Sequence, residues 1–246
     1  MLRFLSIPFV AALLVTAASA APITLGIHGG SSIPDLRDNG GNEISRGWSS
    51  RRAPFYGVSA ELSAVGPWSL LAEVNFTGQG GTRNEIQPVT DPRLTSNLPP
   101  GTTAYANFDN VAKFNYVEIP VLVRYHLPAP LHPSLAFGPY AGFLTSAKQV
   151  TSGTSDVWAN KAGTQPIPGM SAVDFNATTP VKSDLRTFNW GVQAGVGAAL
   201  PYGRGAITLD VRGALGLTNI QKDSANGKNA TGALIVALGY ALPVGL

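Results

Sequence analysis

The chain has 246 residues, of which 44% are hydrophobic and only 13% are charged, about half the charged share that is usual in soluble domains. Its 28 glycines and 19 prolines disfavour a helical bundle, because both residue types destabilise helix interiors. The absence of cysteine excludes a disulfide framework, a cysteine-ligated metal centre and a thiol nucleophile. The net charge of +3 is too small to indicate nucleic-acid binding.

Residues 1–20 have the organisation of a secretory signal. Arg3 precedes an apolar run over residues 4–16, and residues 18–20 read ASA, the pattern that signal peptidase cleaves. The apolar run is shorter than a membrane-spanning helix requires. We therefore expect a signal peptide followed by a single exported domain, residues 21–246. Later apolar stretches are interrupted by glycine, proline or polar residues, which excludes a helical membrane protein.

Beyond the leader, eight segments alternate apolar and polar residues with a period of two, which predicts β-strands. In chain order, the alternation is clear around residues 56–63, 70–76, 116–126, 190–200, 207–215 and 234–240, and weaker over residues 23–30 and 135–145. Residues 116–126 give the cleanest example, with Val117, Val121 and Tyr125 on one face and Glu118 and Arg124 on the other. Eight strands in four hairpins are expected.

The polar face of these strands indicates what surrounds them. It mixes glycine and serine with charges of both signs, and its charged members are Glu61, Glu73, Glu118, Arg124, Asp210 and Arg212. Such a mixture suits a narrow interior, because unpaired charges away from water are very costly. The apolar face carries aromatic residues toward its ends, as lipid-facing bands do. The sequence therefore predicts an all-β fold: an eight-stranded antiparallel up-and-down transmembrane β-barrel.

The connections between the segments support the same fold. Three are long (residues 31–54, 78–112 and 149–186), three are short (residues 64–67, 128–133 and 201–205), and a final loop lies near residues 221–229. Outer-membrane barrels have short periplasmic turns and long extracellular loops. We therefore expect the cell outer membrane, with the first long connection outside the cell.

One strand carries a family resemblance. Residues 114–125, FNYVEIPVLVRY, resemble a strand of the PorT-like outer-membrane β-barrel family, and residues 138–142 (GPYAG) and 210–220 (DVRGALGLTNI) are similar to two further strands of that family. The resemblance implies a small barrel in a Gram-negative envelope and, through the member that names the family, an association with protein secretion. Such barrels commonly end in an aromatic residue, so we expect the last strand to finish at Tyr240 or Leu242.

The inward charges allow two interpretations. They could form an ion path or a site for a small polar ligand, but eight strands leave room only for side chains or one small ligand, so a structural plug of ion pairs is expected. His28, on the inward parity of the first segment, could act with an acid such as Glu73 as a general base in lipid hydrolysis. No G-x-S-x-G motif accompanies it, so an outer-membrane lipid-modifying enzyme is only the alternative.

The long connections hold two further candidate features. One is a basic set, Arg37, Arg46, Arg51 and Arg52, which suits the phosphates of lipopolysaccharide or is a set of solvated loop charges. The other is a set of aromatic residues, Trp48, Tyr105, Phe108, Trp158 and Phe175, which could anchor a protein partner or pack the loops against one another.

We therefore expect a non-enzymatic, monomeric outer-membrane barrel with a structural, adhesive or partner-binding role through its external loops. Its expected contacts are outer-membrane lipid, lipopolysaccharide and an unknown protein partner, and we expect no nucleic acid, cofactor or metal. Two alternatives to a binding role in the membrane stay open besides the enzyme. One is a component associated with secretion, and the other is a soluble periplasmic lipid carrier in which the alternation is reversed.

Overall fold

A computed structural model describes residues 22–38, 40, 43–96, 98, 102–170, 172–223 and 227–244. The predicted signal peptide, residues 1–20, lies outside them. The long strands are β1 (Ile23–Asp38), β2 (Ala53–Ser63), β3 (Trp68–Pro88), β4 (Tyr105–His126), β5 (Ser134–Ser152), β10 (Phe188–Tyr202), β11 (Gly205–Gly216) and β12 (Asn229–Val244). None of the helical segments in this part of the chain has the length and apolar character needed to span a bilayer.

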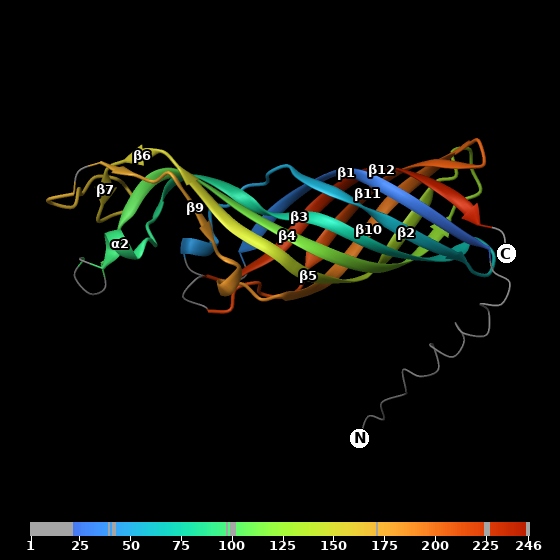
Figure 1. The fold of residues 1–246 in the computed structure, drawn as a ribbon, viewed down its shortest axis with the longest axis horizontal. Helices are drawn as coiled ribbons and strands as arrows, with labels where there is room; N and C mark the ends of the chain where they lie inside the picture. Colours follow the sequence, from blue (N-terminus) through green and yellow to red (C-terminus); the bar gives the residue numbers. More distant parts are fainter. Residues whose placement is uncertain are drawn as a thin grey trace, which may run out of the picture.

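The eight long strands form a closed ring (Figure 1). Each one pairs antiparallel with the next along the chain, and β1 pairs with β12 over its whole length, Ile23 opposite Val244 and Asp38 opposite Asn229. Closure leaves no open sheet edge around the barrel, which a membrane-spanning sheet requires. The predicted eight-stranded antiparallel up-and-down β-barrel is confirmed.

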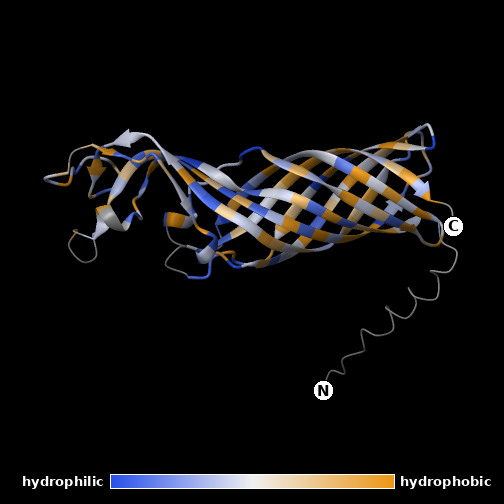
Figure 2. Ribbon diagram, viewed as in Figure 1, coloured by the Kyte–Doolittle hydropathy of each residue, from blue (hydrophilic) through white to orange (hydrophobic). Residues whose placement is uncertain are grey.

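The two faces of the wall alternate as the period of two predicts. On β4, Val121 is 41% exposed while the next residue, Leu122, is fully buried, and on β11 Leu209 is exposed while Arg212 is buried. Figure 2 shows this alternation of hydrophobic and hydrophilic residues along the strands of the barrel. The apolar parity therefore faces outward, so the soluble-carrier arrangement, with its reversed alternation, is wrong.

Aromatic side chains lie in pairs on the outer surface. The ring pairs are Tyr56 with Phe76 at 4.9 Å, Trp68 with Tyr125 at 4.7 Å, and Phe143 with Phe188 at 5.6 Å. Two of these pairs belong to one register row, because Phe76 and Phe143 both lie opposite Val117. Trp68 and Tyr125 lie beside the short turns, so aromatic residues occupy two levels of the wall, as in membrane barrels.

Three strands continue well past the barrel wall. Neighbouring β2 pairs with β3 only as far as Thr77, and β10 pairs with β5 only as far as Phe143. Beyond these points β3, β4 and β5 pair with one another, together with the short strands β7 (Val157–Trp158) and β9 (Ala177–Pro180). We call this region (residues 78–88, 105–115 and 145–152, with β7 and β9) the protruding sheet. Figure 1 shows it at the end remote from both termini.

The predicted bounds of several connections are consequently wrong. Much of residues 78–112, expected as a loop, belongs to β3 and β4, and β1 extends to Asp38 instead of ending near Gly30. The last strand ends at Val244 rather than at Tyr240 or Leu242. The physical reason is that a paired strand satisfies its backbone hydrogen bonds, so pairing continues wherever a neighbouring strand is present. Shorter elements complete this end: η1 (Glu43–Ser45), α2 (Pro92–Thr95), β6 (Thr154–Ser155), β8 (Val173–Asp174) and η2 (Lys182–Asp184).

Candidate functional site

A bidentate ion pair crosses the lumen between β11 and β3. Arg212 Nη1 and Nη2 donate to Glu73 Oε2 and Oε1, both at 2.7 Å. The Asn75 amide adds a third hydrogen bond to Glu73, 2.8 Å long. Paired guanidinium and carboxylate groups form the strong, directional class of hydrogen bond, so this contact holds two opposite parts of the wall at a fixed distance.

A second arginine extends the pair into a chain. Arg124 Nη2 donates to Asp210 Oδ1 at 2.8 Å, and Arg124 Nη1 donates to Glu61 Oε2 at 3.1 Å. Arg212 Nη2 lies 3.6 Å from the same Asp210 oxygen. Five of the six charged residues that the sequence analysis singled out are thereby joined in the order Glu61, Arg124, Asp210, Arg212, Glu73. We call this set the lumenal ion-pair chain.

The sixth residue, Glu118, lies apart from this chain. Its carboxylate accepts hydrogen bonds from Gln79 Nε2 at 2.9 Å and from Gln193 Nε2 at 3.3 Å, and the residue is 1% exposed. No ion pair reaches it among the residues that the structure describes. Neutral amides, rather than an arginine, therefore surround this carboxyl group.

Several members of the lumenal network escaped the sequence analysis because they carry no fixed charge. Asn75, Gln79 and Gln193 all lie on the inward parity, so the rule that located the charges could have located them too. His28 Nε2 lies 2.7 Å from Asn75 Oδ1, and its ring stacks on Phe55. His28 is thus held within the same network.

The His28–Glu73 pair proposed for lipid hydrolysis lacks a free carboxylate. Both Glu73 oxygens already accept hydrogen bonds from Arg212. A general base needs an accessible acceptor within hydrogen-bond reach of the proton that it removes. The geometry therefore favours a structural role for this pair over catalysis.

Two cavities lie at the two ends of the barrel and have no lining residue in common. The cavity at the short-turn end has a volume of about 330 Å³ and reaches Glu61, Arg124 and Asp210 of the ion-pair chain. Between the cavities, the packed side chains of Phe55, Tyr140, Ala214, Ile235 and Ala237 fill the lumen. The barrel therefore has a filled middle rather than a continuous pore.

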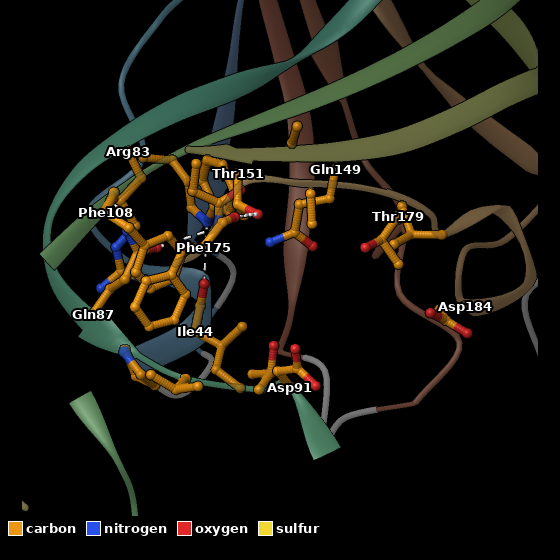
Figure 3. A pocket seen from close by; sticks show the side chains of 18 of the residues that line it. Ile44, Arg83, Gln87, Asp91, Phe108, Gln149, Thr151, Phe175, Thr179 and Asp184 are labelled. Carbon is orange, nitrogen blue, oxygen red and sulfur yellow. Dashed lines mark hydrogen bonds between the residues drawn. The ribbon is translucent and has the colours of Figure 1, made fainter. Parts of the chain in front are cut away.

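The larger cavity, about 1080 Å³, lies at the long-loop end under the protruding sheet. Figure 3 shows that its lining is divided: Phe108 and Phe175 lie on one side, while Gln149, Thr179 and Asp184 lie on the other. The two phenylalanine rings stack at 4.5 Å with an angle of 7° between their planes. One wall is therefore apolar and the opposite wall is polar.

Buried polar side chains from β3 and β4 also line the larger cavity. Arg83 is 3% exposed, and its Nε and Nη1 donate to Glu85 Oε1 and to the carbonyl oxygen of Glu43. Asn110 is 5% exposed and donates to Gln87 Oε1 at 3.2 Å, while its own Oδ1 has no hydrogen-bond partner. An unsatisfied buried acceptor is unusual in a folded protein, and this one lies in the lining of a cavity.

The four loop arginines are not equivalent. Arg46 pairs with Asp38 at 3.1 Å. Arg51 is half-buried and donates to the carbonyl oxygen of Gln79 at 2.8 Å, and burial lowers the pKa of its guanidinium group. Arg37 and Arg52 keep exposed side chains. Two of the four are thus engaged within the protein.

The loop aromatic residues pack against the protein. Phe108 and Phe175 form the stacked pair described above, and Trp48 packs against the cluster that contains Leu36 and Phe114. Tyr105 Oη donates to Glu43 Oε2 at 2.8 Å, which ties the tip of β4 to η1. For these residues, loop packing, the second of the two interpretations, is what the structure contains.

Comparisons with solved structures place other barrels beside this chain. Ail, the attachment invasion locus protein of Yersinia pestis, solved in complex with the heparin analogue sucrose octasulfate, has 10% sequence identity and a TM-score of 0.39 over 91% of this chain and 99% of Ail. A major outer membrane protein from Thermus thermophilus has 13% identity and a TM-score of 0.44 over 92% and 100% of the two chains. Neisserial surface protein A (NspA) has 11% identity and a TM-score of 0.39 over 90% and 97%.

Comparison with curated proteins gave no match. A family model described as "Outer membrane protein beta-barrel domain" matches residues 17–222, most of the chain. This match agrees with the closed ring, the outward apolar parity and the aromatic pairs of the wall. The chain therefore belongs to the outer membrane protein β-barrel domain family, whose place is the outer membrane.

Proposed function

We propose that this protein is a non-enzymatic barrel that binds a partner outside the cell, at its long-loop end. The observation that carries the proposal is the cavity of about 1080 Å³ under the protruding sheet, with the unpartnered Asn110 Oδ1 in its lining. A cavity with apolar walls and a few convergent polar groups is the usual form of a binding site. The paired strands of the protruding sheet supply a rigid frame for it.

The filled lumen supports binding rather than conduction. The side chains packed around Phe55 and Tyr140 separate the two cavities, and the lumenal ion-pair chain joins opposite walls below them. Such an interior leaves the loop end as the part of the molecule that is built for contact. Short turns toward the periplasm and long connections toward the exterior are the rule in outer-membrane barrels, which places the larger cavity outside.

Three finer assignments stay predictions. The PorT-like resemblance of residues 114–125, with its link to secretion, is narrower than the family that the chain matches. Cleavage of residues 1–20 awaits N-terminal sequencing of the mature protein. Lipopolysaccharide contact through the loop arginines rests now on Arg37 and Arg52, because Arg46 and Arg51 already bind groups of this protein.

Site-specific photocrosslinking in intact cells tests the binding role. A benzophenone amino acid would be placed at Gln149 or Thr179, both in the cavity lining, and at Leu209 on the lipid-facing wall as the control. We expect a discrete adduct from the cavity positions and only lipid adducts from Leu209. Absence of an adduct at both cavity positions, in cells where the control labels lipid, would contradict the proposal.

A further inference from the structure

Two lysines lie directly opposite each other at the base of the protruding sheet. Lys113 of β4 and Lys148 of β5 are register partners, so both side chains project from the same face of the sheet. That face is the outer one, because the flanking residues of β4, Ala112 and Phe114, are buried in the interior. Like charges in direct cross-strand positions destabilise a sheet, so the arrangement calls for an anion.

No acidic residue of this face offsets the two charges. The cross-strand partner of Lys113 on β3 is Gly80, and its diagonal neighbours on β5 are Ser146 and Val150. Within the described residues, neither lysine forms an ion pair. The compensating anion must therefore come from outside the protein.

A third lysine lies at the same place in the fold. Lys148 is opposite Pro180 of β9, and Lys182 follows two residues later, at the start of η2. Lys182 Nζ donates to the carbonyl oxygen of Thr145 at 2.9 Å, which holds this ammonium group beside β5. We call Lys113, Lys148 and Lys182 the lysine patch.

The height of the lysine patch above the aromatic row matches a lipid headgroup. Phe143 lies in the outer aromatic row, and Lys148 is five residues farther along β5. Five strand residues span about 16 Å, or about 12 Å along the axis of a barrel whose strands tilt by about 40°. Aromatic girdles mark the interface, and lysine stems reach back toward it. The ammonium groups therefore lie at the level of lipid headgroups.

We propose that the lysine patch binds the phosphate groups of an outer-leaflet lipid, with lipid A as the partner of matching chemistry. The inference goes beyond the proposed function, because it concerns the outer wall and not the cavity. It also moves the phosphate contact away from the loop arginines singled out in the sequence. Three lysines around one site can neutralise a doubly phosphorylated headgroup without any change in the fold.

Lipid capture by the full-length barrel in nonionic detergent tests the proposal. The probes are bis-phosphorylated lipid A, lipid A with its phosphates removed, and inorganic phosphate. We expect tight binding of the first alone, with an affinity that falls as salt is raised. Equal binding of the dephosphorylated lipid would overturn the proposal, and so would inorganic phosphate that competes at a concentration equal to that of the lipid.

Charge-removing variants locate the site. Each of Lys113→Gln, Lys148→Gln and Lys182→Gln should weaken lipid A binding about 5-fold, and the triple variant roughly 100-fold. Lys161→Gln is the matched control, because Lys161 is exposed in the connection after β7, outside the lysine patch. A triple variant that binds lipid A as the control does would refute the assignment.

A stability measurement guards against variants that merely fold poorly. Lys148→Gln removes the cross-strand repulsion, so its unfolding midpoint in lipid-free detergent should rise or stay equal to that of the wild type. With lipid A present, the order should reverse, because only the wild type keeps the full phosphate site. Unchanged order in the two conditions would argue against lipid compensation of the lysines.

Discussion

Removing one partner of the Arg212–Glu73 ion pair should destabilise the barrel strongly and unequally. The two side chains are 3% and 1% exposed, and breaking a buried pair costs about 3–5 kcal/mol, because the remaining charge is uncompensated. Arg212→Met leaves the Glu73 carboxylate with the Asn75 amide and no cation, so we expect a loss near the middle of that range, about 4 kcal/mol. Glu73→Gln leaves Arg212 3.6 Å from Asp210, which limits the expected loss to about 2 kcal/mol.

The same substitution at Glu118 should have a different result. Glu118 accepts hydrogen bonds from two neutral amides, so Glu118→Gln removes a charge that no arginine offsets. The Oε1 atoms of Gln79 and Gln193 have no hydrogen-bond partner, so either amide can turn to accept a bond from the new Nε2. We therefore expect Glu118→Gln to lie within about 1 kcal/mol of the wild type or to be more stable.

Urea unfolding of the full-length protein in phospholipid vesicles measures these differences, with tryptophan fluorescence and heat-modifiable gel migration as two independent readouts. The double variant Glu73→Gln/Arg212→Met should recover most of the stability, because it leaves no unpaired charge. Arg46→Met is the control, because its ion pair is largely exposed and is worth less than about 1 kcal/mol. The reasoning fails if Glu73→Gln is as harmless as Glu118→Gln, or if it costs more than Arg212→Met.

Two further predictions use the rest of the molecule. Because the chain has no cysteine, Val121→Cys and Leu122→Cys can be labelled without background, and a lipid-phase thiol reagent should modify only the former; the reverse would contradict the outward apolar parity. The hydrogen bond to Glu43 raises the pKa of Tyr105 above its ordinary value of 10.0, so it stabilises this end below about pH 10 and is lost as the pH rises through the higher pKa of the folded state. Ultraviolet titration, with Tyr105→Phe as the blank, should show that pKa fall in Glu43→Gln, and an unchanged titration would exclude the hydrogen bond as its cause.

The wall of the barrel could be predicted from the sequence because parity is a local property. A strand such as residues 116–126 turns successive side chains to opposite faces, so an apolar set interleaved with Glu118 and Arg124 defines which face meets lipid. The same rule placed Asp210 and Arg212 inside before any pairing was known. Strand length was not predictable in this way, since residues 78–88 and 105–112 read as polar loop sequence and become strands only because they lie beside each other.

The partners across the lumen could not be predicted, because parity says which face a residue occupies and not which residue it meets there. Glu73 and Glu118 are alike in the sequence, each an acid between apolar neighbours on the inward parity. The register of eight strands brings one of them against Arg212 and the other against Gln79 and Gln193. The opposite sign expected for Glu73→Gln and Glu118→Gln is therefore a property of barrel closure, and neither strand contains it alone.

The same distinction separates the lysine patch from the loop arginines. Arg51 and Arg52 are neighbours in the chain and stood out in the sequence, yet the fold directs Arg51 to the carbonyl oxygen of Gln79. Lys113 and Lys148 are 35 positions apart and attract no notice until the register of β4 and β5 sets them side by side. Charge that is scattered along a barrel sequence becomes a binding surface only through register, so phosphate contacts in such proteins should be sought among cross-strand pairs near the aromatic rows rather than among runs of basic residues.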